Sequence, residues 1–198
     1  MIDAQPEMVE MAEEEKDVFF GVINRFIGFF SLEAQRKTTN DTANEYPFVA
    51  MDTRQVYEQL KFVKKYLGIS DTGPVCSLVD VGCGFGNVLL FAEQLSFDVY
   101  GIEKDEFTVP LAVRLFGEDK IEQADIRTYP NYDRFDVIYY FCPLPNHDPQ
   151  KKLERYIEDR MKVGAILIAN RKKSMEIDED SRFKRLSDSF PIWQKVSV

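Results

Sequence analysis

Short apolar runs alternate with amphipathic stretches of helical spacing throughout the second half of the chain. The apolar runs predict strands near 75–81, 97–102, 120–124, 135–141 and 164–169. The stretches between them predict helices near 87–95, 105–116 and 149–161, the last with Asp148 as its N-cap and Pro149 as its first residue. This alternation is typical of an α/β fold with a doubly wound, mostly parallel sheet and helices on both faces. Such sheets bind ligands at the carboxyl ends of their strands.

Another helix is expected over residues 53–67, where apolar residues recur at helical spacing. Asp52 or Thr53 caps its start and Gly68 ends it. The chain then divides into three parts: an acidic, mobile arm (1–17), an N-terminal helix and loop that form a cap or lid (18–50), and the α/β domain (51–198). The tail of the domain predicts a C-terminal β-hairpin.

The stretch "VFFGVINRFIGFF" (18–30) is the most apolar part of the N-terminal region. The residues that share one face of a helix there are Phe19, Ile23, Phe26 and Phe30, with Phe20 and Ile27 widening it. Asn24 and Arg25 interrupt the run, which is also too short to span a membrane. We expect this helix to lie against the domain, with a contact between copies in an oligomer and a substrate lid as open alternatives.

Composition narrows the classes of partner. The 198 residues are 44% hydrophobic, which is enough for one domain with a real core. The net charge of −9 argues against broad binding to nucleic acid or to an acidic membrane surface, because both need a positive field.

Cys76, Cys83 and Cys142 are widely separated, and His147 is the single histidine. This spacing supports neither a disulfide framework nor a metal site. The first seventeen residues carry seven acids, the opposite of a secretion signal's basic start. We therefore expect a reducing, cytoplasmic setting.

The glycine cluster "VDVGCGFGN" (79–87) directly follows the first apolar run of the α/β region. Such a turn could hold a nucleotide phosphate, hold another ligand, or be a plain tight turn. A dinucleotide site asks for G-x-G-x-x-G, but here the glycines alternate, and Asp80 stands two residues before the first. A carboxylate there repels a pyrophosphate and suits a ligand with an ammonium and a sulfonium group. The charges thus favour S-adenosylmethionine over NAD.

The stretch "VDVGCGFG" resembles motif I of the class I S-adenosylmethionine-dependent methyltransferases, in which an acidic residue precedes GxGxG. The resemblance implies a Rossmann-like fold and a methyl-donor site. It assigns Asp80 to the amino acid end of the donor and the glycine turn to its methionine portion. The turn residues it implicates are Gly82, Cys83, Gly84 and Gly86.

Two further elements follow in the family's order. Glu103, at the end of the second expected strand, corresponds to the acid that accepts the ribose hydroxyls, with Lys104 beside it. Asp125 resembles the adenine-contacting acid, with the Ile126 N–H close to the ring. A looser likeness links residues 53–67 and the glycine motif to the Dot1-like protein-lysine methyltransferases, and we carry no substrate over from it.

The acceptor should lie beyond the fourth expected strand, where the sequence reads "YYFCPLPNHD" (139–148). This departs from the Asn/Asp/Ser-Pro-Pro-aromatic motif of enzymes that methylate planar amines, and it weakens any prediction of adenine or cytosine methylation. Tyr140 and His147 are the candidate catalytic residues, and Phe141 is a candidate for cofactor contact. Cys142 is not expected to be a nucleophile, because no histidine is clearly paired with it.

The basic run "RKKS" (171–174) follows the fifth expected strand. Such runs are usually solvated, but this one lies near the ligand edge of the sheet and could attract an acidic acceptor.

The sequence thus predicts an S-adenosylmethionine-dependent methyltransferase that transfers a methyl group by in-line displacement. Its acceptor is unidentified, with a small molecule favoured and a protein side chain next. Two alternatives are a non-catalytic protein that binds S-adenosylmethionine or S-adenosylhomocysteine and an NAD-dependent oxidoreductase.

Overall fold

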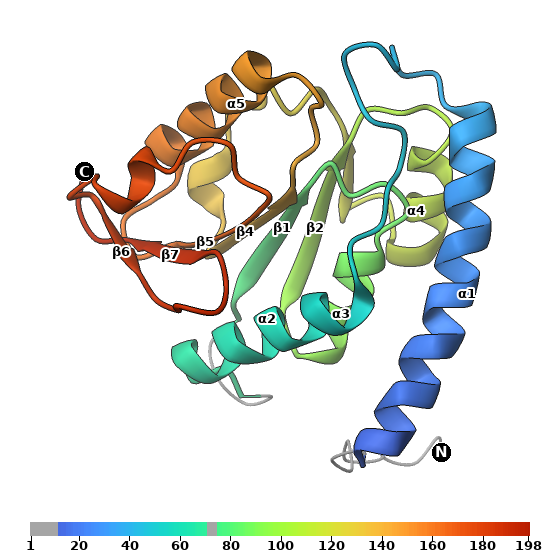
Figure 1. Ribbon diagram of the computed structural model, residues 1–198, viewed down its shortest axis with the longest axis horizontal. Coiled ribbons are helices and arrows are strands. Elements are labelled where there is room, and N and C mark those ends of the chain that lie inside the picture. Colours follow the sequence, from blue (N-terminus) through green and yellow to red (C-terminus); the bar gives the residue numbers. More distant parts are fainter. Residues whose placement is uncertain (1–11, 71–74) are drawn as a thin grey trace.

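The computed structural model describes residues 12–70 and 75–198, and they form one α/β unit around a seven-stranded sheet (Figure 1). The strands are β1 (Ser77–Val81), β2 (Asp98–Glu103), β3 (Ile121–Gln123), β4 (Val137–Phe141), β5 (Ile166–Asn170), β6 (Phe183–Arg185) and β7 (Ile192–Lys195). The helices are α1 (Glu13–Lys37), α2 (Thr53–Leu67), α3 (Asn87–Gln94), α4 (Val109–Phe116) and α5 (His147–Arg160).

The sheet has the order β3-β2-β1-β4-β5-β7-β6. Strands β1 to β5 pair in parallel, β7 runs antiparallel to β5, and β6 runs antiparallel to β7. The predicted α/β fold with a mostly parallel sheet and a C-terminal hairpin is confirmed. The chain winds outward in one direction from β1 to β3 and in the other from β4, so β1 and β4 flank the topological switch point where such sheets bind ligands.

Successive residues of the central strands enter two separate cores. Leu78 of β1 packs in the core that α2 and α3 cover, whereas its neighbour Val79 packs in the core beneath α5. This division follows from the pleat, which points adjacent side chains to opposite faces of the sheet. Both faces are therefore apolar, as expected for a mostly parallel sheet.

The start of α5 differs from the one expected. Helix α5 begins at His147 with Asn146 as its N-cap, so Asp148 lies inside the first turn rather than before it. The crossover between β3 and β4 is short and contains a 3-10 turn at Tyr132–Arg134 in place of an α-helix.

Helix α1 is longer at both ends than the sequence predicts. It starts at Glu13, so residues 13–17 are helical instead of part of a mobile arm, while the first eleven residues of that arm lie outside the described residues. It ends at Lys37, seven residues beyond Phe30. Three glutamates in its first turn and two basic residues in its last turn oppose the charges of the helix dipole and extend the helix.

The face of α1 that packs on the domain is rotated from the predicted one. Phe20 is 5% exposed and lies with its ring centroid 5.5 Å from Tyr57 of α2 and 6.2 Å from Phe91 of α3. Phe26, predicted for the packed face, is 63% exposed. Figure 1 shows α1 along one edge of the domain, so that one side of the helix packs and the other stays exposed.

No helix in the described part of the chain combines the length and apolar character that crossing a bilayer requires.

Replacing Phe20 by alanine tests the docking of α1. We expect Phe20→Ala to lower the free energy of unfolding by about 3 kcal/mol, because it removes a buried ring and leaves a cavity between two helices. Phe26→Ala is the matched control and should change it by less than about 0.5 kcal/mol. Urea denaturation measures both, and equal effects would contradict this packing.

Candidate functional site

A cavity opens at the carboxyl edge of the sheet, over the switch point between β1 and β4. Each strand from β1 to β5, or the loop directly after it, contributes to its wall. The sequence-predicted residues that line it are Asp80, Gly82, Glu103, Lys104, Asp125, Ile126 and Phe141. Residues predicted separately along the chain therefore meet in one place.

The glycine turn joins β1 to α3 and is closed by its own hydrogen bonds. The N–H groups of Gly82 and Cys83 both donate to the Ile102 carbonyl, at 2.8 and 3.1 Å. The Gly84 N–H donates to Glu103, and the Gly86 N–H donates to the Cys83 carbonyl. These four amides are already satisfied within the chain, so they are not presented to an anion.

Close approach explains why glycine stands in this turn. Gly84 has φ +54°, and an added Cβ would lie 2.0 Å from the ring of Phe48. Cys83 is buried below the turn, with its sulfur 2.6 Å from where a Cβ of Gly101 would be. Cys83 thus packs the turn against β2 and is absent from the cavity wall, as are Gly84 and Gly86.

Asp80 is the least compensated charge at the cavity. Its residue is 4% exposed, and within residues 12–70 and 75–198 its carboxylate has neither a hydrogen bond nor an ion pair. Burial raises the pKa of Asp80 well above its usual range, and the neighbouring charge of Glu103 raises it further. The folded chain therefore holds a carboxyl group that resists ionisation unless a cation comes close.

Glu103, at the end of β2, is held by the backbone around it. One carboxylate oxygen accepts the Gly84 N–H at 2.9 Å, and the other accepts the N–H groups of Lys104 and Asp105 at 2.7 and 2.9 Å. Burial raises the pKa of Glu103, although these three amides act in the opposite direction. The side chain is thus oriented at the cavity, and it ties the glycine turn to the end of β2.

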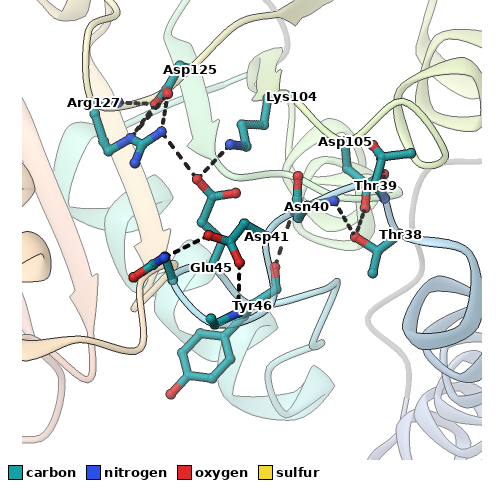
Figure 2. Close-up of polar contacts among 12 residues, drawn as sticks. Thr38, Thr39, Asn40, Asp41, Glu45, Tyr46, Lys104, Asp105, Asp125 and Arg127 are labelled. Atoms are coloured by element: carbon teal, nitrogen blue, oxygen red, sulfur yellow. Dashed lines mark hydrogen bonds and ion pairs between the residues drawn. The ribbon is translucent and has the colours of Figure 1, made fainter.

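A chain of ion pairs closes the β3 side of the cavity (Figure 2). Arg127 donates to the Asp125 carboxylate at 2.9 Å and lowers the pKa of that group. Arg127 also lies 3.2 Å from Glu45, and the Glu45 oxygen in that pair lies 2.6 Å from the Lys104 ammonium. Glu45 is 6% exposed, and its other oxygen, Oε2, is buried with no hydrogen-bond partner in the part of the chain that is described.

Glu45 belongs to residues 38–51, which follow α1 and which we call the capping segment. Thr38 and Thr39 anchor its start by donating to the Asp105 carboxylate (Figure 2), at 2.6 Å for the Thr38 hydroxyl. In its middle, the Tyr46 N–H donates to the Pro143 carbonyl at 3.5 Å. The capping segment therefore bridges the loops after β2 and β4 and forms one wall of the cavity.

Neither candidate catalytic residue lies at the cavity. Tyr140 points into the opposite core, beneath α5, because it alternates with Tyr139 and Phe141 along β4, and these two line the cavity instead. His147 begins α5 with 60% of its side chain exposed and is not part of the cavity wall. The structure therefore does not bring Tyr140 and His147 to the cavity with the other predicted residues.

Within residues 12–70 and 75–198, no group of three or more His, Cys, Asp or Glu side chains is placed to hold a metal ion. The three cysteines are free and buried, and burial raises the pKa of the Cys142 thiol beside the cavity. A neutral thiol is a poor nucleophile, which agrees with the expectation for Cys142.

The sequence matches no protein-family model, and no curated protein matches it. Similar solved structures include an S-adenosylmethionine-dependent methyltransferase from Clostridium acetobutylicum (16% identity, TM-score 0.49, covering 60% of this chain and 50% of that one). Another is CalS10, an amino pentose methyltransferase from Micromonospora echinaspora (19%, 0.46, 59% and 48%). A third is the sugar N-methyltransferase KedS8 from a Streptoalloteichus species (15%, 0.48, 85% and 58%).

The chain spans about half the length of the solved structures it matches, or slightly more. At these identities and TM-scores, its function has to be inferred from its own residues.

Neutralising Asp80 should stabilise the protein in the absence of ligand. The raised pKa means that ionised Asp80 disfavours the folded state, so stability falls as pH rises above 3.8, the usual value for aspartate, towards the folded-state pKa. We expect ligand-free Asp80→Asn to melt a few degrees above wild type at neutral pH, about 2–4 °C per kcal/mol. Below the usual aspartate pKa the two proteins should converge. Calorimetric melting against pH measures this, and a less stable Asp80→Asn variant at neutral pH would contradict it.

Proposed function

We propose that this chain is an S-adenosylmethionine-dependent methyltransferase with a small-molecule acceptor. The observation that carries the proposal is the uncompensated Asp80 carboxylate beside a glycine turn at the switch point of the sheet. A second buried carboxylate, that of Glu103, lies next to it and disfavours its ionisation. A ligand that carries positive charge and several hydroxyl groups satisfies both.

The same observations argue against a dinucleotide. A pyrophosphate binds where backbone N–H groups at a helix start are free to donate. In the turn that leads into α3, the amides of Gly82, Cys83, Gly84 and Gly86 already have acceptors within the chain, and an ionised Asp80 would repel the phosphate charge. This favours a cationic donor over NAD and supports the charge argument made from the sequence.

The residues fit the donor in the following way. Asp80 takes the ammonium of the amino acid end, and Gly82 lets that end approach the backbone. Glu103, fixed by three amides, accepts the ribose hydroxyls, and Asp125 and Ile126 face the adenine. Phe141 and Tyr139 wall the side of the cavity at the end of β4.

When bound, S-adenosylmethionine supplies an activated methyl group that an acceptor displaces in line. The contribution of the chain is then to align the two molecules and exclude water, which are sufficient sources of catalysis for such a reaction. In the β4 and β5 part of the cavity wall, the described residues include no histidine or carboxylate that could serve as a base. An acceptor nucleophile is therefore already neutral or loses its proton to solvent.

This lack of a base is also what favours the second candidate function, a non-catalytic protein that binds S-adenosylmethionine or S-adenosylhomocysteine. Release of S-adenosylhomocysteine on incubation with S-adenosylmethionine and a panel of small amines and alcohols separates the two candidates.

The capping segment completes the donor site in this proposal. It covers the cavity with Phe48 against the glycine turn and with Glu45 against Lys104 and Arg127. The free Oε2 of Glu45 is a buried acceptor that needs a donor, and the adenine amino group or a ribose hydroxyl supplies one. Residues 38–51 thus act as the cap that the sequence analysis assigned to the broader range 18–50.

The proposal also includes the cellular compartment and a contact between two copies of the chain. Three free, buried cysteines support a cytoplasmic, reducing compartment. Contact between two copies through α1 is supported by its exposed Val22, Phe26 and Phe29. In an antiparallel pair, the acidic first turn of each α1 would face the basic last turn of the other.

Calorimetry with S-adenosylhomocysteine tests the donor site. We expect wild type to bind it and not NAD, and Asp80→Asn to lose roughly ten- to a hundredfold in affinity, the usual effect of removing a charged hydrogen bond. Because burial raises the pKa of Asp80, a bound ammonium that favours its ionised form should promote release of a proton, seen as a heat that depends on the buffer. Asp133→Asn, an exposed change outside the cavity, is the control. Tighter binding of NAD than of S-adenosylhomocysteine would refute the proposal.

Glu45→Gln tests the cap. The variant keeps the size of the side chain and removes the charge that holds Lys104 and Arg127. We expect S-adenosylhomocysteine to dissociate roughly three- to tenfold faster and the amides of residues 38–51 to exchange hydrogen faster. The exposed Glu106→Gln is the control. Unchanged dissociation and exchange in Glu45→Gln would rule out the cap.

A further inference from the structure

We propose that the acceptor carries an anionic group, a carboxylate or a phosphate, and that Arg171 and Lys173 bind it. The inference rests on the proposed function, since it names the class of molecule that occupies the second half of the same cavity. Both residues lie in the loop directly after β5 and line the cavity wall.

Charge is distributed unevenly along the carboxyl edge of the sheet. In the order β3-β2-β1, the cavity receives the carboxylates of Asp125, Glu103 and Asp80. On the other side of the switch point, β4 contributes no charged side chain to the described wall, and the loop after β5 contributes two cations. This distribution fits a methyl donor whose positive charge lies over β1 and an acceptor whose negative charge lies near β5.

These two cations differ from the others in the cavity wall. Lys104 is paired with Glu45, and Arg127 with Asp125 and Glu45. Arg171 and Lys173 have no carboxylate partner anywhere in the described ranges, although the chain has a net charge of −9 and acids are plentiful. Arg171 lies over the Phe141 ring, with its guanidinium carbon 5.2 Å from the ring centroid. This contact steadies the guanidinium and leaves its donors free.

The fold presents these cations to the cavity by anchoring the residue between them. Lys172 turns inward, with 2% of its side chain exposed, and pairs with Glu154 and Glu158 of α5 at 3.0 and 2.7 Å. Glu154 also accepts the backbone N–H of Lys173 at 2.8 Å, so the loop is tied to the helix. The buried pair therefore sets the loop conformation and leaves Arg171 and Lys173 to face the cavity.

The backbone at this point is strained. Arg171 has φ +54°, and Cys142, which lies beside it at the end of β4, has φ +34°. Left-handed conformations of residues other than glycine cost about 1 kcal/mol or more, and they persist where the surrounding structure requires them. Two of the three such residues in the described chain thus lie at the acceptor end of the cavity.

Two anions test the proposal: inorganic phosphate stands for a phosphate group on the acceptor, and acetate stands for a carboxylate. Inorganic phosphate and acetate are titrated separately into protein saturated with S-adenosylhomocysteine, at constant ionic strength. The backbone amides of Phe141, Cys142, Leu144 and residues 170–174 are followed by NMR. We expect at least one anion to give saturable shifts confined to these residues. Tighter phosphate binding identifies a phosphate-bearing acceptor, and tighter acetate binding identifies a carboxylate.

A double variant and a matched control assign the effect to the two cations. Arg171→Gln with Lys173→Gln should weaken anion binding at least tenfold and leave the affinity for S-adenosylhomocysteine unchanged. Lys152→Gln with Lys184→Gln removes the same charge from exposed positions outside the cavity and should leave anion binding as in wild type.

Saturable binding that is lost only in the first double variant supports the inference. Shifts that do not saturate, or equal affinity in both double variants, would overturn it while S-adenosylhomocysteine still binds. Failure of S-adenosylhomocysteine to bind contradicts the proposed function and, with it, the assignment of this end of the cavity to an acceptor.

Discussion

The carboxylate of Glu103 ties together three parts of the molecule that are far apart in the sequence. It accepts N–H groups from the glycine turn and from the loop after β2, and that same loop receives the start of the capping segment through Asp105. Because a buried carboxylate is costly unless it is hydrogen-bonded, these contacts hold the turn, the strand end and the cap in one arrangement. These contacts hold one wall of the cavity in place.

Around that anchor, the cavity divides into two electrostatic halves. Buried acids dominate the β1–β3 side, and their pKa values rise where no cation is near and fall where Arg127 is adjacent. Cations without acidic partners lie on the β5 side. Buried or half-buried charges of this kind are expensive for the fold, and a protein retains them where they meet charges on a ligand. Ionised Asp80 destabilises the ligand-free protein, and a cationic ligand removes that cost. This is the physical basis of the proposed preference for a cationic methyl donor.

The strands, the helices and the residues proposed to bind the methyl donor can be predicted from the sequence, because each depends on a short stretch of chain. The apolar runs of β1 and β4 and the glycine cluster depend on neighbouring positions only. Asp80 lies near the end of an expected strand, and Glu103 and Asp125 each follow directly on one. The sequence near β4 does not show which of Tyr139 and Tyr140 faces the cavity. Both faces of this buried strand are apolar, so no alternation of polar and apolar residues separates them. The sequence therefore could not show that Tyr139, and not Tyr140, lines the cavity.

The sequence by itself determined the α/β architecture, the glycine turn and the acids that flank it, since periodicity and spacing are properties of short stretches of chain. Only the tertiary structure decided that residues 38–51 cover the cavity, that Glu45 joins Lys104 and Arg127, and that Lys172 turns inward while its neighbours turn out. These arrangements depend on contacts between residues far apart in the chain, such as Glu45 and Arg127. Their formation is driven by burial and charge pairing in the folded chain, which no local pattern records.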